Sequence, residues 1–402
     1  MGKQNDDITT SSGDFKLVGF SNFVQSNPQS DLFPIRRFHR IEFWCTDATN
    51  NSCRFSWGLG MPVVAKSDLS TGNATHASYL CRSGDLCFLF TAPYSPFVAT
   101  SNGLDPSSMA SLPSFSYSAC VAFAAKHGLA VQVIAIDRPV FPPVVFDGAA
   151  TIAEVHLYRH VVLRHVSYKT MASDRDNSSP NSWFLPWFEL TDEVSSFPLD
   201  FGIQTLNHTP GNVLELGPAI SYVKRFTGFH EFAKFTEEDV RTDESRLNLV
   251  VLAKNDETIL LPLNETVFGT KRKTQIQTYL EHDGPGMRNR SSVGGFEFIP
   301  PPPPMYYRNL KGRAGDELGI LVDRGDEGTL LQIFTKPVGD RATLILEIIQ
   351  RLGCMLKDDH GKLYQKGMCG GFGKGNFSEL FKSLEEYGKM LDARRVGGPA
   401  SV

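Results

Sequence analysis

Phe38–Trp44 reads Phe-His-Arg-Ile-Glu-Phe-Trp, and its alternation of apolar and polar side chains predicts a half-buried β-strand. A helix is expected next, over Ala48–Trp57, because Gly58-Leu59-Gly60 follows it as a stop signal. Further strands are expected near residues 75–81, 85–91, 130–136 and 150–168. One strand, one helix and then several strands indicate a βαβββ module in an α+β protein.

The second half of the chain repeats this order about 169 positions later. Three pairs of segments correspond: Phe38–Ile41 with Leu206–Thr209, Ser56–Gly60 with Arg225–Phe229, and Asp85–Phe90 with Asp256–Leu261. The period is too long for a solenoid and indicates a duplicated domain. We therefore expect two similar halves of paired βαβββ modules, whose curved sheets each enclose a cavity.

The domain boundaries follow from length and local composition. A chain of 402 residues is long enough for two such domains. The segment 172–182, rich in Ser, Asn, Asp and Pro, predicts the boundary between them. We expect a disordered N-terminal tail over residues 1–33, an N-terminal domain over 34–180 and a C-terminal domain over 181–402.

Bulk properties exclude several classes of function and partner. The net charge of −4 gives no electrostatic argument for binding nucleic acid or acidic membranes. No apolar run approaches the roughly 18 residues that a membrane helix needs, and no targeting peptide is apparent, so a cytosolic chain is expected. The seven cysteines form no CxxC pair, which argues against a disulfide framework and against a cysteine zinc site.

One carboxylate interrupts the apolar run Thr343–Leu352 (TLILEIIQRL), which otherwise predicts a buried strand. In a strand, Glu347 would share a face with Ile345 and Ile349, where an ionised carboxylate is costly unless it is paired, protonated or bound to metal. Two interpretations remain open from this segment. Glu347 either faces water or pairs with Arg351, or it is a metal ligand.

A second predicted strand, Thr329–Thr335, places Gln332 and Phe334 on one face just upstream. Mononuclear iron oxygenases hold their metal with two histidines and one carboxylate, which leaves open positions for substrate and O₂. His208, at the start of the second repeat, and Glu347 are candidates for two of these ligands. The alternative for His208 is an ordinary core or surface histidine.

The glycine-rich segment Cys369–Phe377 precedes a predicted helix over residues 376–393. It lacks the GxxxxGK[ST] pattern, so phosphate binding is not expected. Asn376 is the expected N-cap, and Glu379 would complete a capping box. This helix is either an active-site lid behind a flexible turn or a C-terminal helix that simply docks.

Long motifs between about Phe38 and Asp392 resemble the plant-type 4-hydroxyphenylpyruvate dioxygenases, which belong to the vicinal oxygen chelate superfamily. The densest are Gly328–Pro337 (GTLLQIFTKP), Glu347–Arg351 (EIIQR) and Cys369–Phe381 (CGGFGKGNFSELF). The resemblance implies a non-catalytic N-terminal domain and a catalytic C-terminal domain with a lid helix. It also implies Fe(II) (Fe²⁺) as cofactor and conversion of the 2-oxo acid 4-hydroxyphenylpyruvate and O₂ to homogentisate and CO₂, in tyrosine catabolism. A homodimer is what the family suggests.

The resemblance also implies roles for individual residues. His208 and Glu347 match iron ligands, while Gln275, Gln332 and Asn264 match polar positions of the substrate pocket. Four phenylalanines match aromatic positions: Phe334 and Phe377, between which aromatic ligands stack, and Phe372 and Phe381 in the lid region.

Three segments are shorter than in the family. Between His282 and Phe296 lie only 13 residues, with four glycines and a proline, too few for the family's strand and helix. The second iron-ligand histidine of the family is therefore absent, and His282 is a weak candidate to replace it. The other gaps fall at 314–319 and 136–141, and Leu249, Ile345 and Asn207 replace a serine, a phenylalanine and an aspartate. The alternative interpretation is accordingly a catalytically impaired product that retains at most ligand binding.

Overall fold

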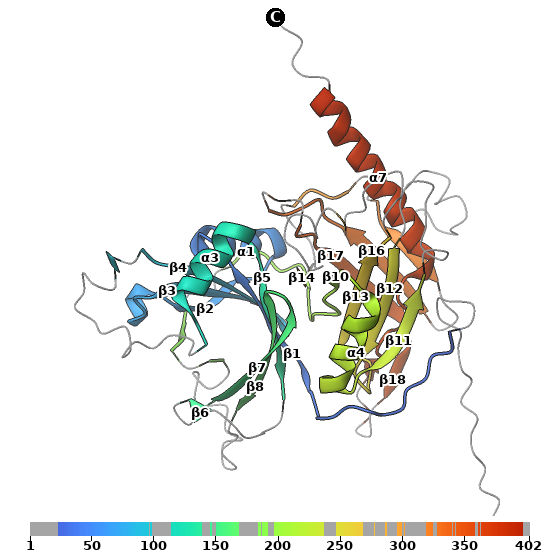
Figure 1. Ribbon diagram of the computed structural model, residues 1–402, viewed down its shortest axis with the longest axis horizontal. Helices are drawn as coiled ribbons and strands as arrows, with labels where there is room; N and C mark the ends of the chain where they lie inside the picture. Colours follow the sequence, from blue (N-terminus) through green and yellow to red (C-terminus); the bar gives the residue numbers. More distant parts are fainter. Residues whose placement is uncertain are drawn as a thin grey trace, which may run out of the picture.

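The structure is a computed structural model. It describes residues 23–95, 97–98, 114–138, 145–146, 150–168, 184–185, 187–191, 197–236, 247–267, 277, 286–287, 296–299, 301, 319–324, 328–339, 341, 343–357, 361 and 363–396. Two halves lie side by side, each built on a curved sheet with helices packed against it (Figure 1). The α+β class expected from the sequence is confirmed.

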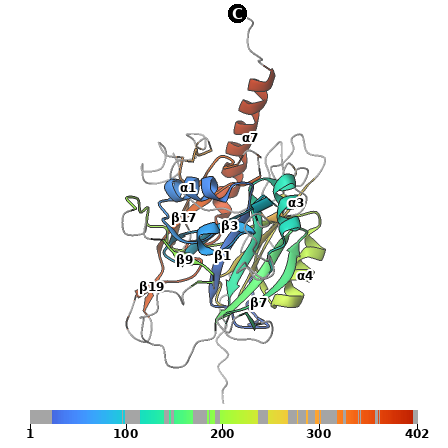
Figure 2. The ribbon, with the colours of Figure 1, turned by 90° about the vertical axis from the view of Figure 1, so that its left-hand side faces the viewer.

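The N-terminal half is a nine-stranded sheet in the order β6-β7-β8-β5-β1-β4-β3-β2-β9. Its strands are β1 (Arg37–Trp44), β2 (Val63–Ser67), β3 (His76–Ser83), β4 (Leu86–Pro93), β5 (Ala130–Asp137), β6 (Val145–Phe146), β7 (Ala150–Tyr158), β8 (Val161–Tyr168) and β9 (Glu189–Leu190). Helices α1 (Ala48–Leu59) and α3 (Tyr117–His127) lie near the same end of this sheet (Figure 2). A short 3₁₀ turn, η1 (Leu69–Thr71), follows β2.

The C-terminal half contains a five-stranded sheet, a three-stranded sheet and a hairpin. The first sheet orders as β11 (His230–Phe235), β12 (Leu247–Ala253), β13 (Leu260–Thr266), β10 (Gly211–Val213) and β14 (Gly286–Met287). The second consists of β15 (Leu321–Arg324), β16 (Gly328–Phe334) and β17 (Glu347–Gly353), and the hairpin of β18 (Met355–Lys357) and β19 (Leu363–Gln365). Two helices complete this half, α4 (Leu216–Thr227) and α7 (Lys374–Val396).

The two halves repeat one another in topology. Strand β1 runs parallel to β4 and antiparallel to β5, and β10 likewise runs parallel to β13 and antiparallel to β14. The module helices α1 and α4 both end at a left-handed glycine, Gly60 and Gly228, whose backbone N–H closes the last turn. The duplication predicted from three sequence matches is therefore confirmed.

A single apolar cluster joins the halves. Phe43, Phe55 and Phe90 of the first half belong to the same buried cluster as Val250 and Leu263 of the second. Burial of apolar surface is the main favourable term in folding, so this arrangement makes each half part of the other's core.

Three sequence-based boundaries differ from the structure. The predicted disordered tail over 1–33 is too long, because residues 23–33 are ordered: Leu32 N donates to Thr227 O (2.9 Å) and Ser30 Oγ to Gly228 O (2.6 Å). Gly228 permits this approach, since a Cβ there would overlap the backbone of Ser30. Strand β9, beyond the predicted boundary at 180, pairs with β2 of the first sheet.

The third difference concerns the run that contains Glu347. The predicted strand over 343–352 begins only at Glu347, since residues 344–346 are irregular and lead into it. Ile345 is buried but does not lie on the strand. Glu347 is therefore the first residue of β17, opposite Phe334 at the end of β16.

Candidate functional site

His208 and Glu347 come from distant parts of the chain and meet in the interior. His208 makes an isolated parallel bridge with Leu260 at the start of β13, and Glu347 begins β17. Both are buried, with 4% and 2% of their surface exposed. His208 Nε2 lies 3.2 Å from Glu347 Oε2. The interpretation of Glu347 as a carboxylate that faces water is therefore wrong.

Hydrogen bonding fixes what the imidazole presents to the carboxylate. His208 Nδ1 lies 2.9 Å from Asn207 Oδ1, and an amide oxygen can only accept, so Nδ1 carries the proton and donates. In the neutral ring, Nε2 then carries no proton, and its lone pair faces a carboxylate oxygen. Two acceptors at this distance need a proton or a cation between them.

The pair fits two neighbouring positions around a metal ion. Two ligand atoms bound at about 2.1 Å and at a right angle lie roughly 3 Å apart, close to the separation here. Within the described ranges, no group of three or more His, Cys, Asp or Glu side chains could hold a metal. His282, the candidate for a third ligand, lies outside the described residues.

Two amides hold the carboxylate in place. Gln332 Nε2 donates to Glu347 Oε1 (2.7 Å), and Asn376 Nδ2 donates to Gln332 Oε1 (2.7 Å). Asn376 is thus not the N-cap expected from the sequence. Helix α7 already begins at Lys374, and the side-chain amide of Asn376 bonds Gln332 instead. Gly373, with φ +79°, allows the turn to approach, since a Cβ would lie 2.5 Å from Gln332 Oε1.

Aromatic rings pack next to His208. The Phe372 ring lies 5.1 Å from the imidazole, and Phe377 stacks on Phe372 (6.1 Å between centroids, 30° between planes). Phe235 of β11 closes the group, 5.1 Å from Phe377. Phe334 belongs to a neighbouring apolar cluster with Ile299, Leu321, Ile345 and Leu380.

Three further site residues were predicted from the sequence, and the structure describes them to different extents. Asn264 is buried on β13, where its amide donates to Asn212 Oδ1 (3.2 Å), about 13 Å along the strand from the bridge at Leu260. Phe381 is part of α7, but its side chain is outside the described part of the structure, as is all of Gln275. Asn207 and Asn376 are contacts that sequence reasoning did not assign to the site.

Helix α7 is anchored at its start and projects away from the rest of the molecule (Figure 1, Figure 2). Phe377, Leu380 and Ser383 are buried along its first turns. None of the helices in the described part of the chain is long and apolar enough to cross a membrane.

The sequence also predicted no disulfide framework, yet one disulfide joins Cys354 to Cys369. The end of β17 and the turn before α7 run next to each other here, so the two Cα atoms are 5.7 Å apart. The spacing of the cysteines in the sequence does not predict that Cys354 and Cys369 lie close together.

Comparison with known proteins identifies the family of the chain. No protein-family model matches the chain. A 4-hydroxyphenylpyruvate dioxygenase from Daucus carota is 58% identical over 439 residues, which cover 98% of this chain and 96% of that protein. The enzyme of the same name from Arabidopsis thaliana is 57% identical, with 98% of each chain covered. Both alignments are longer than this chain, so both relatives have positions with no counterpart here.

Solved structures with the same fold are more distant in sequence. A mutant of 4-hydroxymandelate synthase from Streptomyces coelicolor gives a TM-score of 0.63 at 19% identity, covering 88% of this chain and 99% of that one. A xylose isomerase-like TIM barrel/4-hydroxyphenylpyruvate dioxygenase fusion protein gives 0.55 at 16% identity, covering 90% and 54%. These two likenesses concern the fold alone. On the strength of its plant relatives, the chain belongs to the 4-hydroxyphenylpyruvate dioxygenase family.

Proposed function

We propose that this chain converts 4-hydroxyphenylpyruvate and O₂ to homogentisate and CO₂, with Fe(II) held by His208 and Glu347. The observation that carries the proposal is the buried imidazole and carboxylate, with His208 Nε2 3.2 Å from Glu347 Oε2 and Nδ1 engaged by Asn207. Membership of the family supports the reaction and substrate class. Bound iron would supply a centre for chelation of the 2-oxo acid and for reduction of O₂.

The chain's own residues would bind and orient the substrate. Gln332 holds the Glu347 carboxylate through Oε1, which leaves Oε2 directed at His208. Phe372, Phe377 and Phe235 offer apolar faces that exclude water and can stack with the phenol ring of the substrate. We assign Gln275, Asn264, Phe334 and Phe381 to the same pocket on the resemblance alone.

The larger-scale features are part of the same proposal. They are a non-catalytic N-terminal domain, a catalytic C-terminal domain with a lid helix over 376–393, a homodimer and a cytosolic location. Burial of Phe377 and Leu380 at the start of α7 supports the lid, since this is the part of the helix that lies against the site.

A coupled assay tests the reaction. Purified chain with Fe(II), ascorbate and 4-hydroxyphenylpyruvate should consume O₂ and release homogentisate, followed by an oxygen electrode and by chromatography. Glu347→Gln is the matched control, because it keeps shape but removes the negative ligand, and it should abolish turnover.

The opposite result has a clear meaning because two of the three ligands expected of the family lie in the described site. A chain that is folded by circular dichroism but releases no homogentisate overturns the proposal. Retained binding of an aromatic diketone inhibitor by such a chain would then support the alternative, a catalytically impaired product that retains ligand binding.

A further inference from the structure

We propose that Asn207 and Arg351 are positioning residues, which hold the His208 imidazole with its Nε2 lone pair presented beside Glu347. The inference rests on the proposed metal site, but it concerns hydrogen bonds within this chain. It assigns a role to two side chains that are not themselves proposed as metal ligands.

Arg351 lies four residues after Glu347 on β17, and its partly buried guanidinium bonds the turn that precedes α7. Burial lowers the pKa of Arg351 to about 10, with the Glu347 carboxylate acting in the opposite direction, so the group remains charged at neutral pH. A buried charge is costly unless its N–H groups are bonded, which makes its partners structurally important.

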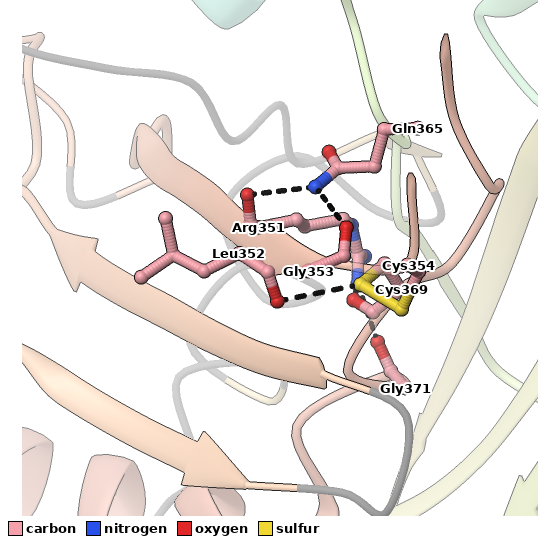
Figure 3. The surroundings of a disulfide bond; sticks show 7 residues. All are labelled: Arg351, Leu352, Gly353, Cys354, Gln365, Cys369 and Gly371. Atoms are coloured by element: carbon pink, nitrogen blue, oxygen red, sulfur yellow. Dashed lines mark hydrogen bonds between the residues drawn. A yellow bond between two sulfur atoms is a disulfide. The ribbon is translucent and has the colours of Figure 1, made fainter. Parts of the chain in front are cut away.

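The turn supplies two of these partners. Arg351 Nη1 donates to Cys369 O (2.6 Å) and to Gly371 O (2.7 Å) (Figure 3). The Cys354–Cys369 disulfide ties this turn to the end of β17, and Gln365 donates to the carbonyls of Arg351 and Gly353 in the same strand. The guanidinium is thereby held against this turn through Nη1.

The other end of the guanidinium reaches Asn207. Arg351 Nη2 donates to Asn207 Oδ1 (3.3 Å), and the same oxygen accepts from His208 Nδ1 (2.9 Å). If the amide were turned over, its NH₂ group would face the Arg351 guanidinium, which can only donate. Arg351 therefore fixes which end of the Asn207 amide meets the imidazole.

A fixed amide oxygen selects one tautomer and one orientation of His208. With the proton on Nδ1, the lone pair on Nε2 points to Glu347 Oε2 at 3.2 Å. Groups that orient a ligand in this way commonly change metal affinity by about 10- to 100-fold when they are removed. The hydrogen bonds from Arg351 to Asn207 and from His208 to Asn207 orient the imidazole in this way.

The test compares Asn207→Leu, which keeps the size of the side chain but removes the acceptor, with Asn207→Asp, which keeps it. Co(II) binding to each full-length chain is measured by anaerobic absorption titration. We expect about 10- to 100-fold weaker binding for Asn207→Leu and a return toward the wild-type affinity for Asn207→Asp. Asn73→Leu is the matched control, since Asn73 is a buried asparagine of the other half that bonds Ser67 and His76.

A spectroscopic signature separates positioning from general destabilisation. In the Co(II) chain, the His208 Nδ1 proton should give a paramagnetically shifted NMR signal that exchanges slowly because Asn207 accepts it. Asn207→Leu should lose this signal, and Asn73→Leu should retain it.

Two outcomes distinguish the hypotheses. Equal Co(II) affinity and an unchanged signal in wild type and Asn207→Leu overturn the present inference alone. A folded wild type that binds Co(II) with the expected signal but releases no homogentisate overturns the proposed reaction and leaves the positioning role supported.

Discussion

Buried histidines in the N-terminal half make its stability depend on pH. Burial lowers the pKa of His76 to about 4, and burial with the nearby Arg138 charge lowers that of His165 to about 4. Burial also moves the pKa of His39 well below its ordinary value, with Arg40 as the next cause. Each ring is therefore neutral in the folded chain at neutral pH.

The unfolded chain takes up protons on these rings as the pH falls below about 6.5, whereas the folded chain does not until about pH 4. Stability is therefore fully present above about pH 6.5 and is lost as the pH falls. Between about pH 7 and about pH 5, we expect each of His76 and His165 to lower the free energy of unfolding by about 2 kcal/mol. Urea unfolding at the two pH values measures this loss.

His165→Phe provides the matched comparison. Phenylalanine keeps the edge contact with Phe33 and cannot be protonated. The variant should lose about 2 kcal/mol less than wild type over the same pH range. An identical loss in both proteins would show that His165 is not held neutral.

How far single residues are predictable depends on whether their signal is local. Glu347 was visible because a carboxylate in an apolar run is anomalous, and the structure does bury it beside His208. Asn207 and Arg351 gave no sign of a contact with each other, because polar residues in or beside strands are common. Their contact joins positions 144 residues apart, and only the fold brings them together.

Element boundaries show the same division between local and tertiary causes. Helix α1 begins where it was predicted, because the Asp47 side chain caps it by accepting from Asn50 N. Gly60 ends the helix in a left-handed conformation. The start of α7 was misplaced because Asn376 looks like a capping residue. Its amide bonds Gln332 instead, which is a tertiary contact that overrides the local pattern.

The junction between β16, the end of β17 and the turn before α7 leaves no room for a further side chain. At Gly328, an added Cβ would lie 2.8 Å from Cys354 Sγ and closer still to Cys369 Sγ. Gly328→Ala should therefore displace the disulfide or the strand and lower the free energy of unfolding by about 1–3 kcal/mol. Urea unfolding and thiol titration of the folded chain measure the two effects.

Gly217→Ala is the control for this substitution. Nothing lies within 4 Å of an added Cβ at Gly217, in the first turn of α4, and alanine favours a helix by about 0.5–1 kcal/mol over glycine. This variant should be as stable as wild type or more stable. Equal stability of Gly328→Ala and wild type would mean that the junction is loosely packed.

The apolar cluster shared by the halves predicts that the molecule unfolds as one unit. Trp44 lies on β1 and Trp57 on α1, so the fluorescence of these two tryptophans reports on the N-terminal half, whereas circular dichroism reports on both halves. Leu263 is fully buried on β13 of the other half, in the same cluster as Phe43 and Phe90.

Leu263→Ala should consequently destabilise the N-terminal sheet as well as its own strand. Removal of a buried leucine side chain costs about 2–5 kcal/mol, and the loss should lower the fluorescence and circular dichroism midpoints of urea unfolding by the same amount. The two transitions coincide only if the shared core couples the sheets. A fluorescence midpoint that stays at the wild-type value, beside a dichroism curve that splits into two steps, would show that the N-terminal sheet folds independently of the half that holds His208 and Glu347.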